Sequence, residues 1–124
     1  MTDHLPEQDA CTVDTARGPF ERVMHPPGSK SLTNRALLLA ALARGRSTLH
    51  APLVSDDTVA LRDALEVLGA SSTADERRWV IDGVDGAFPN GGTVDLGDGG
   101  TPARFMLAAA ALASGDVCVD GSPR

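Results

Sequence analysis

Two alanine- and leucine-rich segments, 70 residues apart, constrain the fold of this chain more than any other feature. Residues 37–45 and 107–115 are identical at six of nine positions, and each segment follows a glycine-containing turn and precedes a short strand-like stretch. Alanine-rich helices resemble one another by composition alone, but the shared flanking pattern favours a duplicated supersecondary unit. We therefore expect two helices with equivalent N-termini, with Lys30-Ser31 in one copy opposite Gly100-Thr101 in the other.

Neither repeated helix has a polar face over its alanine-rich part, whereas neighbouring strands alternate apolar and polar residues. A helix that is apolar all round is typically buried. Strands that alternate, such as 93–96 and 117–120, expose one face to water. The sequence therefore predicts an α/β (α+β) fold with its helices inside and its sheets outside, the reverse of a doubly wound sheet.

The 124 residues divide into a lead-in and one domain. Residues 1–19 are predicted to be a flexible lead-in that ends at the turn signal Gly18-Pro19, and residues 20–124 to form the domain. The strands expected there are 21–25, 47–50, 71–74, 79–82, 93–96 and 117–120, and the expected helices are 32–43, 58–68 and 101–113. The middle helix is amphipathic, and residues 55–57 offer its N-cap.

The composition argues against nucleic acid and anionic membranes as partners. The net charge is −6, no basic run occurs, and aromatic residues make up 3% of the chain, so neither a basic surface for nucleic acid or an anionic membrane nor a base-stacking platform is expected. The leader 1–15 lacks the basic start and the apolar run of a signal peptide. No apolar segment reaches membrane-spanning length without interruption. The sequence predicts a cytoplasmic protein.

Cysteine and histidine residues are too sparse to indicate a disulfide or a metal centre. Cys11 and Cys118 stand alone, which is typical of free thiols in a reducing compartment. His4, His25 and His50 lack the spacing of metal ligands. We expect no metal site.

The turn before the first helix carries the strongest functional signal. Pro27-Gly28 delivers Lys30 and Ser31 to the helix start, where free backbone N–H groups and the helix dipole favour an anion. Lys30 adds a mobile charge and Ser31 a hydroxyl donor. Arg35, four residues after Ser31, shares its helical face and offers a planar guanidinium. The pattern predicts a site for a phosphorylated small molecule; the alternative is that these are solvated surface charges.

A second glycine-rich turn, within residues 96–104, has the same layout. Its glycines let the backbone approach a bound group closely, because no Cβ intervenes. Thr101 is the expected N-cap, Pro102 the first helical residue, and Arg104 a cation in the first turn. Alone this would be an ordinary strand–turn–helix connection, but two such turns in one chain strengthen the prediction for both.

Neither turn fits a nucleotide-binding motif. A P-loop that ends at Lys30 requires glycine at positions 24 and 29, where this chain has Met24 and Ser29. A dinucleotide fingerprint that starts at Gly97 requires glycine at position 102, where this chain has Pro102. The sequence therefore supports binding of neither a nucleoside triphosphate nor NAD.

Three segments resemble the motifs of a known enzyme family. The segment Pro27–Arg35 resembles the N-terminal signature of the 3-phosphoshikimate 1-carboxyvinyltransferases, or EPSP synthases. The segment Leu96–Arg104 resembles the second signature of that family, and Asp120–Arg124 resembles the start of a third, basic segment. The resemblance runs from about Val23 to Arg124, and the three segments occur in the same order.

This resemblance implies a transferase of the shikimate pathway, which leads to chorismate and the aromatic amino acids. Members transfer the enolpyruvyl (carboxyvinyl) group of phosphoenolpyruvate to the 5-hydroxyl of shikimate 3-phosphate and release phosphate. The implied fold is an inside-out barrel domain built from repeated βαβαββ units, with the helices within. The implied protein needs no cofactor and is a monomer at full length.

The resemblance also implies roles for individual residues. Lys30 would be catalytic and contact both substrates, while Ser31 and Arg35 would hold shikimate 3-phosphate. Gly100 would border the phosphoenolpyruvate pocket, and Arg124 would hold the phosphate of phosphoenolpyruvate. The supporting residues would be Thr101 and Arg104.

The chain departs from the family pattern in two ways that keep alternatives open. Asp98 stands where the family commonly has Asn, which brings a carboxylate near anionic ligands. Family members are several times longer, so we expect an N-terminal portion with little turnover alone. One alternative is the sister enolpyruvyl transferase acting on UDP-N-acetylglucosamine, although that enzyme usually has Asn after the Lys and Ser31 favours the shikimate enzyme. The other alternative is a non-catalytic, anion-binding remnant.

Overall fold

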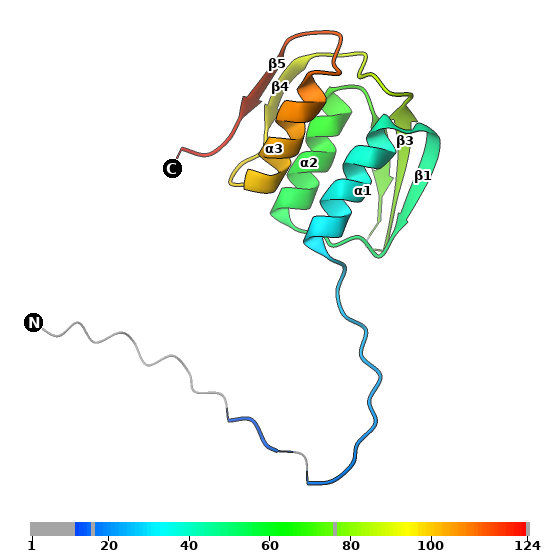
Figure 1. The fold of residues 1–124 in the computed structure, drawn as a ribbon, viewed down its shortest axis with the longest axis vertical. Helices are drawn as coiled ribbons and strands as arrows, with labels where there is room; N and C mark the ends of the chain where they lie inside the picture. The colour runs from blue at the N-terminus through cyan, green and yellow to red at the C-terminus, as the bar shows by residue number, and fades with distance from the viewer. Residues whose placement is uncertain (1–11, 16, 76, 124) are drawn as a thin grey trace, which may run out of the picture.

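Three helices and five short strands make up the fold in the computed structural model, which describes residues 12–15, 17–75 and 77–123 (Figure 1). In chain order the elements are α1 (Lys30–Leu42), β1 (Arg44–His50), α2 (Asp56–Val67), β2 (Ser71–Ala74), β3 (Arg78–Val84), β4 (Gly92–Asp95), α3 (Gly100–Ala110) and β5 (Val117–Asp120). The mixed content of helices and strands confirms the predicted α/β class. Residues 1–11 of the expected lead-in, with His4 and Cys11, lie outside the described residues.

All three predicted helices are confirmed, and each begins one or two residues earlier than expected. The side chain of Ser29 caps α1 by accepting a hydrogen bond from the Leu32 amide, 3.4 Å away. At the start of α2, Ser55 and Thr58 form a reciprocal capping box, in which the Ser55 amide donates to the Thr58 hydroxyl at 2.9 Å. These caps satisfy backbone groups that the helix itself leaves free and extend both helices toward the N-terminus.

The strands form two separate sheets within the described residues. β1, β3 and β2 form an antiparallel sheet in that order, with Ser47 opposite Ile81. β4 and β5 pair in parallel, with Val94 opposite Val119. Because parallel neighbours need a crossover, α3 connects these two strands as the helix of a strand–helix–strand unit.

The helices lie side by side between the two sheets, with α2 in the middle (Figure 1). α1 packs against β1 and β3, α2 against β2 and β4, and α3 against β5. The largest side chains of the common core are those of Leu37, Leu61, Leu65, Leu68, Trp79, Ile81, Phe88, Leu96 and Met106. This arrangement agrees with the prediction that the helices lie inside the sheets. None of the helices in the described ranges is long and apolar enough to cross a membrane.

The prediction that the repeated helices are buried on every side is wrong for one face of each. On α1, Leu32 and Leu39 are each 68% exposed, and on α3, Leu107 is 65% exposed. The two sheets and α2 cover only part of the circumference of α1 and α3. Among the described residues, each of these helices therefore leaves leucine side chains in contact with solvent.

The prediction of a strand at residues 21–25 is also wrong. The segment forms no strand, and Val23 and Met24 are both exposed. Its equivalent in the second copy of the repeat, β4, lies 70 residues later and pairs with β5. No strand among the described residues pairs with 21–25, and a strand needs such a partner for its backbone hydrogen bonds.

Candidate functional site

The N-termini of all three helices lie at the same end of the molecule (Figure 1). The α1 and α2 ends meet where Gly28 packs against residues 51–53, just before α2. The α2 and α3 ends meet at a depression of about 410 Å³ that is lined by both Asp56 and Gly97. The positive ends of three helix dipoles gather at this end of the molecule and favour anions there, whereas Asp56 and Asp57 in the first turn of α2 oppose them.

Ser31 and Arg35 lie together on the first turns of α1, as predicted. The Arg35 guanidinium donates from Nη1 to the Ser31 hydroxyl oxygen and also to the Ser31 carbonyl oxygen, the latter at 3.0 Å. Both residues are exposed. The guanidinium is therefore held back along the helix toward its N-terminus, where the expected phosphate group would lie.

Lys30 is the first residue of α1, and its ammonium group is already paired. Its Nζ lies 2.9 Å from Oδ2 of Asp57, in the first turn of α2. The Lys30 side chain is 53% exposed and that of Asp57 is 23% exposed. Sequence reasoning offered Asp57 as part of the α2 cap, but Ser55 takes that role and Asp57 contacts the predicted site.

A short hydrogen-bond network braces the Lys30 turn against the start of α2. The Thr33 hydroxyl accepts from the Leu53 amide at 3.0 Å, and the Thr58 hydroxyl donates to the Leu53 carbonyl at 2.8 Å. A Cβ placed on Gly28 would lie 2.5 Å from the Ala51 carbonyl oxygen, so only glycine permits this approach. Sequence reasoning missed the roles of Thr33 and Thr58, although the Ser55–Thr58 spacing is that of a capping motif.

The start of α3 differs from its prediction, because Thr101 is not the N-cap. Gly99 occupies that position, without a side-chain hydrogen bond, and α3 begins at Gly100. The helix starts earlier because the Gly99 carbonyl already accepts the first helical hydrogen bond, from the Ala103 amide at 2.9 Å. Pro102 is consequently the third helical residue, and the N-cap residue Gly99 has no side chain to bond the first-turn amides of α3.

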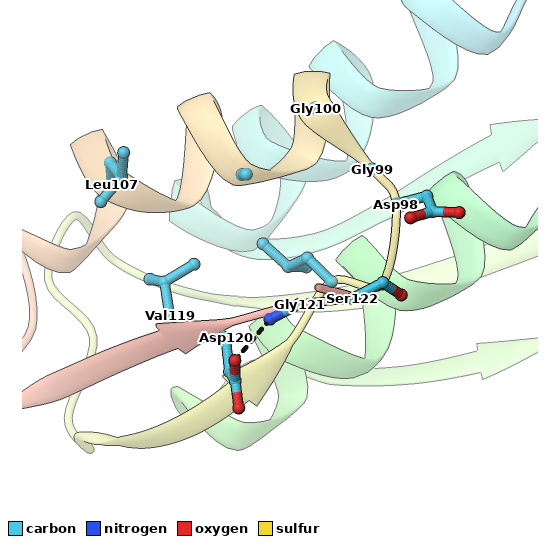
Figure 2. Close-up of a pocket in the computed structure, with 11 residues that line it drawn as sticks. Asp98, Gly99, Gly100, Leu107, Val119, Asp120, Gly121 and Ser122 are labelled. Atoms are coloured by element: carbon cyan, nitrogen blue, oxygen red, sulfur yellow. Dashed lines mark hydrogen bonds between the residues drawn. The ribbon is translucent and has the colours of Figure 1, made fainter. Parts of the chain in front are cut away.

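A depression of about 430 Å³ opens beside this helix start (Figure 2). Its lining includes the turn 97–100, Ala103 and Leu107 of α3, Val119 of β5, and residues 120–122. The Ser122 amide donates to the Gly97 carbonyl at 3.1 Å, which brings the segment after β5 across the turn. A Cβ on Gly100 would meet no atom within 4 Å, so the backbone there faces open space.

The structure thus brings the two predicted turns to one end of the molecule. Lys30 and Ser31 begin α1, and Gly100 and Thr101 begin α3, which confirms that the repeat duplicates a helix start. Thr101 and the supporting residue Arg104 are exposed. The α2 start, with its acidic first turn, lies between them and was not predicted as part of the site (Figure 1). The predicted phosphoenolpyruvate ligand Arg124 lies outside the described residues.

Asn34 is a further residue of this region that sequence reasoning left without a role. Its side chain is fully buried, and within the described part of the chain neither its Oδ1 nor its Nδ2 has a hydrogen-bond partner. A buried amide without partners is costly. Composition and periodicity carry no signal for such a residue, because Asn34 lies in an otherwise favourable helical sequence.

A sequence profile of the family described as EPSP synthase (3-phosphoshikimate 1-carboxyvinyltransferase) matches residues 15–124. The chain belongs to the EPSP synthase family. This membership agrees with the resemblance of the two glycine-rich turns to the signatures of that family.

Curated EPSP synthases confirm this membership at substantial identity. The chain is 50% identical over 97 residues to the 3-phosphoshikimate 1-carboxyvinyltransferase of Rhizobium leguminosarum bv. trifolii, covering 77% of this chain and 23% of that protein. It is 44% identical over 111 residues to the enzyme of Methanoregula boonei, covering 88% of this chain and 26% of that protein. It is 42% identical over 124 residues to the enzyme of Ralstonia pickettii, covering 98% of this chain and 27% of that protein. The chain therefore spans about a quarter of the length of these relatives.

The fold also matches that of a solved EPSP synthase from Acinetobacter baumannii. The TM-score is 0.68 at 24% sequence identity, and the match covers 77% of this chain and 22% of that one. This likeness concerns the fold, and it places the helix layer and its flanking strands within a known EPSP synthase structure.

Proposed function

We propose that this chain forms part of an enzyme that transfers the enolpyruvyl group of phosphoenolpyruvate to the 5-hydroxyl of shikimate 3-phosphate and releases phosphate. The observation that carries the proposal is that two family-signature turns, each opening a helix, lie at the same end of the molecule. Anionic substrates need a surface rich in N–H donors and cations, and this end supplies both. The chain would provide one wall of the substrate cleft.

Ser31 and Arg35 would bind the phosphate of shikimate 3-phosphate on α1. The Arg35 guanidinium is already bonded to Ser31, so it is preorganised and loses little side-chain freedom when the ligand arrives. Lys30 would contact both substrates from the same helix end. Its ammonium group lies 2.9 Å from Asp57 in the first turn of α2, the helix that lies between α1 and α3.

The α3 start would border the phosphoenolpyruvate pocket. The backbone amides at the helix start would donate to a phosphate or carboxylate oxygen, and the open space at Gly100 leaves room for the ligand. Thr101 and Arg104 would support this side of the pocket. Arg124 would complete it by holding the phosphate of phosphoenolpyruvate.

These residues would act chiefly by position and charge. Protonation of the methylene carbon of phosphoenolpyruvate creates an oxocarbenium-like centre, which the 5-hydroxyl attacks with loss of its proton to form a tetrahedral adduct. This adduct then loses a proton from its methyl group and expels phosphate, which restores the enol double bond. Cations that hold the carboxylate and the phosphates align the reacting atoms and stabilise the departing phosphate. The proton donor and acceptor would come from residues outside this chain, so we expect the 124 residues alone to bind substrate with little turnover.

The complete protein would form the inside-out barrel with its helices within, in keeping with the helices that lie between the two sheets here. We place it in the cytoplasm as a monomer, with no nucleic-acid or membrane partner. The relatives described above are named for the shikimate enzyme, so they do not favour the alternative that uses UDP-N-acetylglucosamine.

The decisive experiment measures phosphate release by the whole protein that carries these residues. Phosphoenolpyruvate is supplied with either shikimate 3-phosphate or UDP-N-acetylglucosamine as the acceptor. We expect release only with shikimate 3-phosphate. Release only with the UDP-sugar would replace the proposed acceptor, and release with neither, together with retained substrate binding, would support the non-catalytic remnant.

A further inference from the structure

The strongest feature that the proposed function does not use is the ion pair between Lys30 and Asp57. The two groups lie 2.9 Å apart and join the first turn of α1 to the first turn of α2. Asp57 is not required as a helix cap, because Ser55 and Thr58 already form the capping box. Its carboxylate instead lies beside the cation that the proposed function assigns to both anionic substrates.

We propose that Asp57 is a positioning residue that holds the Lys30 ammonium group when no anion is bound. An incoming anion competes with Asp57 for that ammonium group. The inference rests on the proposed function, since it requires an anion at Lys30. A long lysine side chain without a partner samples many rotamers, and the ion pair limits that sampling. The same carboxylate repels an anion and shares the positive charge that the anion needs.

The expected size of this competition follows from the exposure of the pair. The Lys30 side chain is about half exposed, and ion pairs of this kind contribute little to stability because solvent screens them. An anion can therefore displace Asp57 at small cost. Because it must displace Asp57, every anion that contacts Lys30 binds somewhat more weakly. Inorganic phosphate, the released product, therefore dissociates more easily.

The probe for this inference is inorganic phosphate, titrated into the 124-residue chain and followed by the amide signals of Ser31 and Arg35 in NMR spectra. Asp57→Asn keeps a hydrogen-bond acceptor for Lys30 but removes the charge. We expect it to tighten phosphate binding about two- to fivefold. A loss of structure cannot produce tighter binding, so this readout separates competition for Lys30 from a merely structural role.

Asp56→Asn is the matched control. Asp56 precedes Asp57 in the same helical turn and is exposed, and no salt bridge to it occurs among residues 12–15, 17–75 and 77–123. Its replacement removes the same charge and the same favourable interaction with the α2 dipole, yet we expect it to change the phosphate affinity by less than about 1.5-fold because solvent screens it. Asp57→Glu, which keeps the charge, should restore an affinity near that of the unchanged chain.

A double-mutant cycle assigns the effect to Lys30. In a Lys30→Ala background, Asp57→Asn should no longer tighten phosphate binding. An unchanged or weaker phosphate affinity in Asp57→Asn, or an equal change in Asp56→Asn, overturns the inference while leaving the anion site intact. If no variant binds phosphate, or if Lys30→Ala leaves the phosphate affinity unchanged, the proposed anion site is overturned together with the inference.

Discussion

α1 and α3 begin at equivalent positions of the repeat, but they bury different faces. Leu37 of α1 is 1% exposed, whereas its equivalent in α3, Leu107, is 65% exposed. The reverse holds for Leu39, which is exposed, and its buried equivalent Ala109. The difference amounts to roughly one residue, or about 100° of rotation around the helix axis. A helical sequence that is apolar on every side does not select a face, so the neighbouring elements select it.

The two turns that precede α1 and α3 also differ between the copies of the repeat. The first is closed, because Gly28 packs directly on the backbone before α2 and Lys30 is paired with Asp57. The second is open at Gly100, because a Cβ there would meet nothing within 4 Å, and its N-cap is Gly99, which has no side chain. The same sequence pattern has therefore produced a closed turn with an ion-paired lysine in one copy and an open turn in the other.

The largest effect that separates the two copies is expected from shortening equivalent leucines. Leu37→Ala should lower the free energy of unfolding by about 2–5 kcal/mol, because it leaves a cavity among buried side chains. Leu107→Ala, its matched control in α3, should change that free energy by no more than about 0.5 kcal/mol. Urea denaturation of both variants measures the difference. Similar losses in the two variants would show that α1 and α3 bury the same face in solution.

Local signals in the sequence were sufficient to predict most of the fold. Both strands 71–74 and 117–120 have the predicted bounds, and all three helices begin and end within about three residues of their predicted bounds. The repeat also predicted that Lys30 and Gly100 occupy equivalent helix starts. These features depend on residues a few positions apart, and a single sequence records such neighbours directly.

Features that depend on distant partners could not be predicted in this way. The segment 21–25 has strand-like residues, but whether it forms a strand depends on a partner elsewhere in the chain. The pair between Lys30 and Asp57 joins residues on two different helices, and nothing in the sequence selects Asp57 over the adjacent Asp56. The face that α1 buries likewise depends on α2 and β3. The long-range part of the site therefore required the structure.

The cation of the closed turn should account for the next largest effect. Lys30→Ala should weaken the binding of shikimate 3-phosphate by about 1.5–3 kcal/mol for each charge-assisted contact that is lost. Calorimetric titration of the 124-residue chain measures this change. Arg44→Ala is the matched control, since it removes an exposed cation at the other end of α1, where Arg44 lies 3.9 Å from Asp85. Equal weakening in both variants would mean that net charge, and not Lys30, governs binding.

Adding one methyl group to each turn tests the closed and open arrangements directly. Gly28→Ala should destabilise the fold by about 1–3 kcal/mol, because its Cβ would meet backbone atoms 2.5 and 2.7 Å away at Ala51 and Leu53. Gly100→Ala should leave stability unchanged or raise it by up to about 1 kcal/mol, since alanine is the better helix former.

In the whole protein, the Gly100→Ala methyl group should instead obstruct the pocket. Binding of phosphoenolpyruvate and of the family inhibitor glyphosate should both weaken, and inhibition and KM measurements would record it. Unchanged affinity for both ligands would remove Gly100 from the phosphoenolpyruvate site. Equal stability losses in Gly28→Ala and Gly100→Ala would contradict the open arrangement of the second turn.

The smallest expected effect concerns the strand that follows α1. Arg46 of β1 donates two hydrogen bonds, at 2.8 and 2.9 Å, to the Asp82 carboxylate on β3 and thereby lowers the pKa of Asp82. Since the folded-state pKa lies below the unfolded value of about 3.9, the pair stabilises the fold above that pH. This contribution is lost as the pH falls through the folded-state value.

Asp82→Asn should therefore flatten the acid dependence of the free energy of unfolding, measured by urea denaturation at a series of acidic pH values. Asp116→Asn is the control, because Asp116 occupies the Arg46 position in the second copy of the repeat. An equal flattening in Asp116→Asn would attribute the effect to the overall negative charge, and would remove this ion pair from the differences between the two copies.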